Sequence, residues 1–200
     1  MKALLYKDII VLKNNLVAIS MISFFLIIAI ISGNVDISYL IASFGLIILF
    51  IKIFESDYKN GFYKYVISNA VEEKSIVTYK YLFILSAAIL VFLFNFLLAF
   101  VTGYDKTFYR FLVFLSINIF LYEILIPIFF RFGKIAIDIV NVVGTVVYIT
   151  GVFYIVKNDT FLKFEIGNKL NIFVILIIID LILFVFSFLL SLKFIRRKIS

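Results

Sequence analysis

The chain consists mainly of long uninterrupted runs of apolar residues, separated by short polar connections. Polar and apolar residues do not alternate within the runs, which argues against strands. A membrane-crossing helix needs ~20 mostly apolar residues, and backbone groups in lipid must bond to one another. We therefore predict an all-α membrane protein with six transmembrane helices in a single domain over residues 1–200. The six runs are Leu16–Ile31, Ser38–Phe54, Tyr81–Thr102, Tyr109–Phe130, Ile135–Val156 and Asn171–Leu192.

Composition excludes several classes of site. Hydrophobic residues make up 65% of the chain, and there is no histidine or cysteine, which rules out disulfides, thiolate catalysis and histidine-based zinc sites. The acids within the runs, Glu123, Asp138 and Asp180, lie one per run rather than in a cluster. A carboxylate metal site needs clustered acids, so an intramembrane enzyme is disfavoured and no metal or cofactor is expected on this chain.

Positive charge is distributed unevenly about the predicted helices. The formal net charge is +7, and most of the 19 Lys and Arg residues fall on one side if the N-terminus is cytoplasmic. Cytoplasmic loops of membrane proteins carry an excess of Lys and Arg. We expect both termini and the connection Glu55–Lys80 to be cytoplasmic, with the positive charge facing anionic lipid rather than nucleic acid.

The segment before the first run has an amphipathic pattern. Leu5, Ile9, Leu12 and Leu16 fall on one helical stripe. This predicts an N-terminal interfacial helix in the headgroup layer; a simple positively charged anchor is the alternative. Because the first run is short, we also expect it to borrow a turn from this segment.

The connection Glu55–Lys80 is the one long, highly charged connection between runs. Some of its aromatic residues have the spacing of one helical face, and Asn69 with Glu72 forms a plausible helix-capping pair, from which a helix would continue through Ile76 and Val77 into the third run. Charged and aromatic residues together favour a docking surface for a soluble partner; packing against the protein's own helix ends is the alternative. The candidate docking residues are Glu55, Asp57, Tyr58, Phe62, Tyr65, Glu72, Glu73 and Lys74.

Three sequence features resemble a known family. They are Lys7-Asp8, Glu55-x-Asp57 and the stretch Ser-Asn-Ala-Val-Glu-Glu-Lys-Ser-Ile-Val-Thr-Tyr-Lys-Tyr over residues 68–81. Together they resemble the membrane subunits of ABC-2 type transporters, and in particular the small six-span permeases of Gram-positive bacteria, which include the permease of the phenol-soluble modulin exporter. Two positions depart from the pattern: Ala70 replaces the usual proline, and Glu73 stands where a hydroxyl residue is common.

The resemblance implies a bacterial plasma-membrane permease that pairs with a second copy or a sister permease and binds two ATPase subunits. Those ATPases would hold ATP and Mg²⁺, and the Glu55–Lys80 connection would contain a cytoplasmic coupling helix. The chain has no phosphate-binding loop, since its one Gly-Lys pair, Gly133-Lys134, is followed by Ile135. Any energy from ATP must therefore come from another polypeptide.

Polar groups inside the runs are a second set of candidate functional residues. Charge at membrane depth is costly and tends to be functional. Glu123, Asp180, Asn95 and Asn118 either line a polar path or hold helices together. For Asp138 we expect an interfacial ion pair with Lys134.

The cargo class follows from the resemblance. It implies export of an amphipathic or hydrophobic substrate, in particular a toxic or antimicrobial peptide. Two alternatives stay open: a ligand-binding six-span membrane subunit of another transporter type, and a membrane protein that gives immunity to a peptide. The segment 157–170 is predicted to be either a short interfacial helix or an ordinary loop.

Overall fold

The structure, a computed structural model, describes residues 2–31, 35–63, 71–103, 108–144, 146 and 169–197. The described residues are almost entirely helical and contain no strand, as predicted. The elements are α1 (Lys2–Lys13), α2 (Leu16–Ile31), α3 (Val35–Lys59), α5 (Glu73–Val101), α6 (Phe108–Phe132), α7 (Lys134–Ile139), the π-helical segment η1 (Val140–Gly144) and α10 (Lys169–Arg197).

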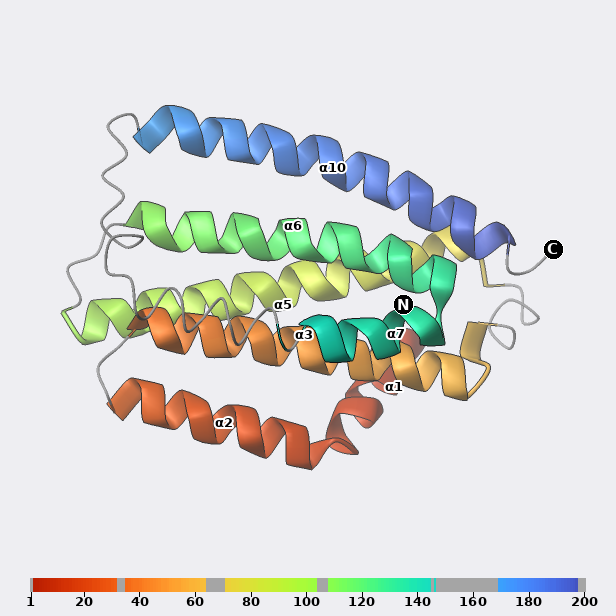
Figure 1. The fold of residues 1–200 in the computed structure, drawn as a ribbon, viewed down its shortest axis with the longest axis horizontal. Helices are drawn as coiled ribbons and strands as arrows, with labels where there is room; N and C mark the ends of the chain where they lie inside the picture. Colours follow the sequence, from red (N-terminus) through yellow and green to blue (C-terminus); the bar gives the residue numbers. More distant parts are fainter. Residues whose placement is uncertain are drawn as a thin grey trace.

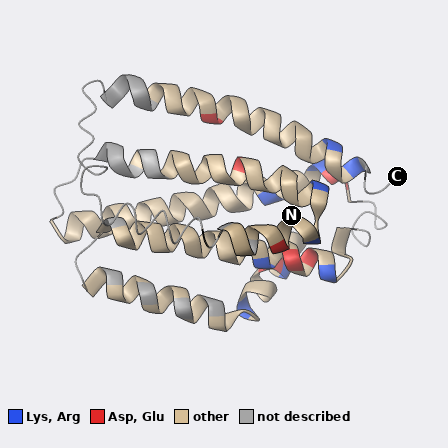
Figure 2. Cartoon of the chain, in the orientation of Figure 1, with Lys and Arg blue, Asp and Glu red and all other residues tan. Residues whose placement is uncertain are grey.

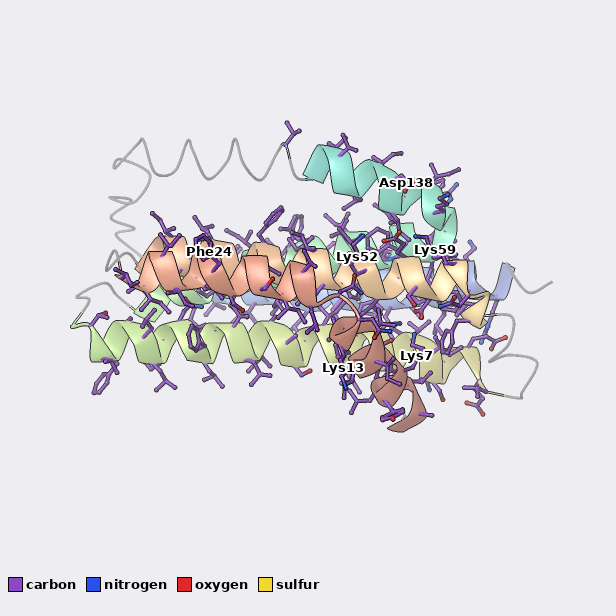
Figure 3. The ribbon with its side chains drawn as sticks, turned by 90° about the horizontal axis from the view of Figure 1, so that it is seen from below. Lys7, Lys13, Phe24, Lys52, Lys59 and Asp138 are labelled. Carbon is purple, nitrogen blue, oxygen red and sulfur yellow. The ribbon has the colours of Figure 1, made fainter. Side chains whose placement is uncertain are left out.

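The long helices lie side by side in a bundle. Helices α2, α3, α5, α6 and α10 run nearly parallel to one long axis, and α1 lies across one end of them (Figures 1 and 3). Helix α2 packs on α3, α3 on α5 and α5 on α6, and the most extensive packing joins α6 to α10. Because short connections join antiparallel neighbours, α1, the end of α3 and the start of α5 meet at the same end of the bundle.

Within the described part of the chain, four helices are long and apolar enough to cross a membrane. Helices α3, α5, α6 and α10 contain the candidate spans Ile37–Lys59, Glu73–Val101, Leu115–Phe132 and Val174–Arg196. The six predicted spans are therefore not confirmed. Helix α2 is apolar but has 16 residues, and at ~1.5 Å per residue it is shorter than a hydrocarbon core of ~30 Å. Half of the predicted span Ile135–Val156, residue 145 and residues 147–156, lies outside the described residues.

The N-terminal segment forms a helix of its own. The prediction that the first run borrows a turn from it is wrong, because the chain turns at Asn14 and Asn15 between α1 and α2. Asn15 donates from its side chain to the carbonyl of Val11 at 2.7 Å, and such local bonds compete with helix continuation. In the predicted apolar stripe, Leu5 and Ile9 are 44% and 49% exposed. They face away from the bundle, and the placement of α1 in a headgroup layer stays a prediction.

The two ends of the Glu55–Lys80 connection are helical. Helix α3 continues past Phe54 to Lys59, and a turn with positive φ at Gly61 follows it. Helix α5 runs through Ile76 and Val77 as predicted, but it begins at Glu73 and not directly after Asn69, because the backbone of Glu72 is extended. Residues 64–70, with Tyr65 and much of the predicted coupling helix, lie outside the described residues, as does most of the segment 157–170.

An aromatic core joins α3 to α6 near the end of the bundle where α1 lies. The Phe54 ring, fully buried, has its centroid 5.1 Å from that of Phe129 and 5.4 Å from that of Phe130. The Tyr58 hydroxyl donates to the Phe129 carbonyl at 2.6 Å. Burying aromatic rings is strongly favourable, so this core gives α3 and α6 a fixed relative position close to the charged residues described below.

Helices α2 and α3 approach each other closely at Gly45. A Cβ atom at this position would lie 2.7 Å from Cγ2 of Ile22 on α2. We predict that Gly45→Ala destabilises the protein in detergent by about 1–3 kcal/mol through overpacking, measured by thermal unfolding. The double variant Gly45→Ala with Ile22→Ala should recover part of this loss. If the second substitution adds to the loss instead, the close contact is not the cause.

Candidate functional site at the charged end of the bundle

Charged residues gather at one end of the bundle (Figure 2). Helix α1 crosses the long helices at this end (Figure 3), which we call the charged end. Four charged side chains from three helices are packed together there: Lys7 and Asp8 from α1, Asp57 from α3 and Lys80 from α5. We refer to these four as the buried ion network.

Each lysine of the network pairs with both aspartates. Lys80 Nζ lies 3.1 Å from Asp8 Oδ2 and 2.9 Å from Asp57 Oδ2. Lys7 Nζ lies 2.7 Å from Asp8 Oδ1 and also forms an ion pair with Asp57. Two positive and two negative charges therefore form a closed, neutral group.

The network is withdrawn from solvent. The side chains of Asp8 and Asp57 are 0% exposed and that of Lys80 is 1% exposed, while Lys7 keeps 24%. Removing a charge from water costs several kcal/mol, and close pairing with additional hydrogen bonds must offset that cost. The loss of any one partner would destabilise such an arrangement, because the remaining charges would be buried without compensation.

Tyrosine hydroxyls complete the coordination of the two carboxylates. Tyr79 donates to Asp8 Oδ2 at 2.8 Å, and Tyr63 donates to Asp57 Oδ2 at 3.2 Å. Burial, followed by the nearby charge of Asp57, raises the pKa of Tyr63 well above its ordinary value. Tyr63 therefore stays protonated and remains a donor. Phe62 lies beneath Lys7, with Nζ 3.9 Å from the ring centroid, a distance at which cation–π attraction stabilises the ammonium.

A groove opens beside the network between α1 and the last turns of α3. Its volume is about 390 Å³, within the range of small-ligand clefts. Its lining includes Tyr6 and Ile10 of α1, Ser56 of α3, and the turn residues Asn14 and Asn60 that follow these two helices. Lys7, Asp57 and Phe62 also line it, so the network is reached from outside through this groove.

The predicted docking residues divide into buried and exposed sets. Asp57 and Phe62 belong to or contact the network, and Tyr58 is bonded to α6. Glu55 forms surface ion pairs with Lys52 at 2.8 Å and Lys59 at 2.6 Å; pairs of this kind contribute little to stability. The remaining described residues lie at the start of α5, where Glu72 and Lys74 are exposed and Glu73 is partly buried.

Sequence reasoning missed the partners of Asp57. Lys7, Asp8 and Lys80 carried the family resemblance, but neither they nor Tyr63 and Tyr79 were assigned a role. One signal was available: Lys80 lies directly before the apolar run of α5, where a lone buried lysine needs a carboxylate partner. The sequence did not indicate which acids would reach it, since Asp8 and Asp57 are 72 and 23 positions away along the chain.

The predicted polar residues inside the spans lie between helices. Asn95 accepts a bond from Ser38 at 2.9 Å, which joins α5 to α3. Asn118 donates to Ser43 at 3.1 Å, which joins α6 to α3. Asp180 accepts a bond from Ser116 across α10 and α6. These contacts favour the helix-holding alternative for Asn95 and Asn118. Glu123 has a different environment.

The expected ion pair between Asp138 and Lys134 is not found. Both side chains are described and exposed, and no ion pair joins them. Asp138 instead interacts electrostatically with Lys59, which lies beside α7 at the charged end (Figure 3). Both side chains are exposed, where an ion pair gains too little free energy to hold two side chains in one geometry.

Comparison with known proteins gives one match over nearly the whole chain. The family model described as "ABC-2 family transporter protein" matches residues 3–196. Searches against curated proteins and against solved structures returned no significant match. The matched residues include every member of the buried ion network.

The network predicts a large difference between buried and surface lysines. Lys80→Met removes the cation between Asp8 and Asp57 and should destabilise the protein by about 3–5 kcal/mol, because it leaves a buried charge uncompensated. Lys59→Met, the matched control, removes a lysine that is 63% exposed and should have little effect. Thermal unfolding in detergent measures both. Equal stability of the two variants would contradict the assignment of Lys80 to a buried network.

Proposed function

The chain belongs to the ABC-2 transporter family, and on this premise we propose that it is the membrane permease subunit of an ABC exporter. The family is a membrane component of transporters and normally works with an ABC ATPase. In this proposal a separate ATPase supplies ATP and Mg²⁺, because the chain has no phosphate-binding loop of its own.

The observation that carries the proposal is the position of the buried ion network. Asp57 lies in the last turn of α3, near the start of the Glu55–Lys80 connection. Lys80 lies at the other end of this connection, on α5. The ion pair between them joins the two ends of the connection, while Lys7 joins Asp57 to α1 and Asp8 joins Lys80 to α1. A force applied to this connection by a partner would therefore move α1, α3 and α5 together.

The proposed ATPase contact lies on the Glu55–Lys80 connection, as a coupling helix within it. Support comes from the exposed side chains of Glu72 and Lys74 at the start of α5. Phe62 and Tyr65 are the proposed aromatic part of the same contact. Two ATPase copies and two permeases, either identical or sister chains, would make the complete exporter.

The proposed cargo is an amphipathic or hydrophobic substrate, in particular a toxic or antimicrobial peptide. The spans offer large apolar side chains and few charges, which suits such a cargo. On α10, Leu181, Phe186 and Leu189 are each about 60% exposed in the single chain. Lipid and a second permease would cover surfaces of this kind in the proposed assembly.

We place the charged end in the cytoplasm of a bacterial cell. Helix α1 and the last turns of α10, with their Lys and Arg residues, lie at this end (Figure 2), and the enrichment of positive charge on the cytoplasmic side supports this orientation. Both termini would then be cytoplasmic, as would the ATPase contact.

Copurification tests the proposed ATPase contact. Lys74→Glu reverses an exposed charge at the start of α5 and should reduce recovery of the cognate ATPase with the permease, together with substrate-stimulated ATP hydrolysis. Lys106→Glu is the matched control, since the same charge reversal lies in the connection predicted to be on the opposite side of the membrane. If both variants retain the ATPase equally, the contact does not include this part of α5.

A further inference from the structure

A second polar cluster lies halfway along the bundle, far from the charged end. Figure 2 shows one acidic position midway along α6 and another midway along α10. Each of these helices contains a single acid, Glu123 in α6 and Asp180 in α10. Both therefore lie within the spans and not at a membrane surface.

The two acids differ in their bonding. Asp180 accepts a hydrogen bond from Ser116. Glu123 is 4% exposed, and neither of its carboxyl oxygens has a hydrogen-bond partner among the described residues. None of the ion pairs in the described part of the chain includes it. An ionised carboxylate in this position would be a buried charge without compensation.

A second unpartnered group belongs to the preceding residue in the chain, Tyr122. The Tyr122 hydroxyl is buried and has no hydrogen-bond partner within the described ranges, and its ring packs on Phe50 of α3. Tyr122 and Glu123 both line one small, partly open cavity between α5, α6 and α10, whose other walls are mainly apolar side chains such as Ile84 and Phe184. Its volume is about 20 Å³, enough to hold one water molecule.

Among the residues that the structure describes, the groups facing Glu123 provide no positive charge. Tyr81 faces it from α5 and Asp180 from α10, and both interact with it electrostatically. Tyr81 is already bonded to Ser187 at 2.5 Å and to Ser191 at 3.0 Å. The surroundings of Glu123 are thus neutral or negative, and both conditions favour a carboxyl that carries a proton.

The backbone holds Glu123 in this position through a specific bond. Pro127 has no N–H, so the carbonyl of Glu123, four residues earlier, loses its helical partner. Ser187 on α10 donates to that carbonyl in place of the missing N–H. The same serine contacts Tyr81, so α5, α6 and α10 are joined directly beside the cavity.

We propose that Glu123 forms a proton-binding site inside the bundle and carries a proton at neutral pH. The small cavity that it lines has room for one water molecule. Contact of more water or of a cation with Glu123 favours release of the proton, so the charge of this residue changes when the bundle opens. This site is independent of the ATPase contact proposed above.

Carbodiimide labelling tests the site on the full chain in lipid vesicles without any partner. Dicyclohexylcarbodiimide reacts with protonated carboxyl groups in apolar surroundings, and mass spectrometry locates the adduct. We expect labelling of Glu123 at neutral pH and its loss as pH rises, because an acid releases its proton with increasing pH.

Two variants keep the test independent of folding. Glu123→Gln preserves the size and neutrality of the group, so it should leave the thermal stability unchanged while it abolishes the label and the infrared C=O stretch of a protonated carboxyl. Asp138→Asn, which changes an exposed acid at the charged end, should leave both signals intact. An unlabelled Glu123 at neutral pH, or labelling that does not fall as the pH rises, would overturn the site.

Discussion

The cost of removing charge from water governs how this chain is assembled. Two lysines and two aspartates are taken into the protein at the charged end, and their burial is tolerable only because each charge contacts two of opposite sign. That condition can be met only when α1, α3 and α5 are in one relative position. The network thus acts less as a source of stability than as a constraint on geometry, since apolar side chains of similar size would hold helices together without specifying so narrow an arrangement.

The helices were predictable from the sequence, but their partners were not. Apolar runs of helical length determine where helices form, and α2 coincides with the predicted run Leu16–Ile31. The predicted helix ends were less accurate. Helices α3 and α5 continue beyond their apolar portions into polar residues, which packing and ion pairs hold in the helix. The contact of Asp57 with Lys80 required knowledge of the fold, since local patterns carry no information about which distant residues meet.

The predicted site residues show the same limit. Exposure could be anticipated at Lys74, which follows a polar segment, whereas Asp57 looked equally solvent-facing in the sequence and is completely buried. A carboxylate near a membrane surface is compatible with either environment, and only a cation within reach decides between them. Asp138 is the opposite case. Lys134 has the correct spacing on the same helix, but a surface ion pair contributes too little free energy for that spacing to determine where the Asp138 side chain lies.

Two solutions to the same electrostatic problem therefore occur in one bundle. At the charged end, opposite charges neutralise one another, which fixes three helices as a unit and suits a region that would transmit force. Midway along the spans, no described residue offers Glu123 an opposite charge, and in our proposal a bound proton neutralises it. A proton, unlike an ion pair, can be released without separating helices. The interior of the bundle can consequently respond to water or to a positively charged group while the arrangement at the charged end stays intact.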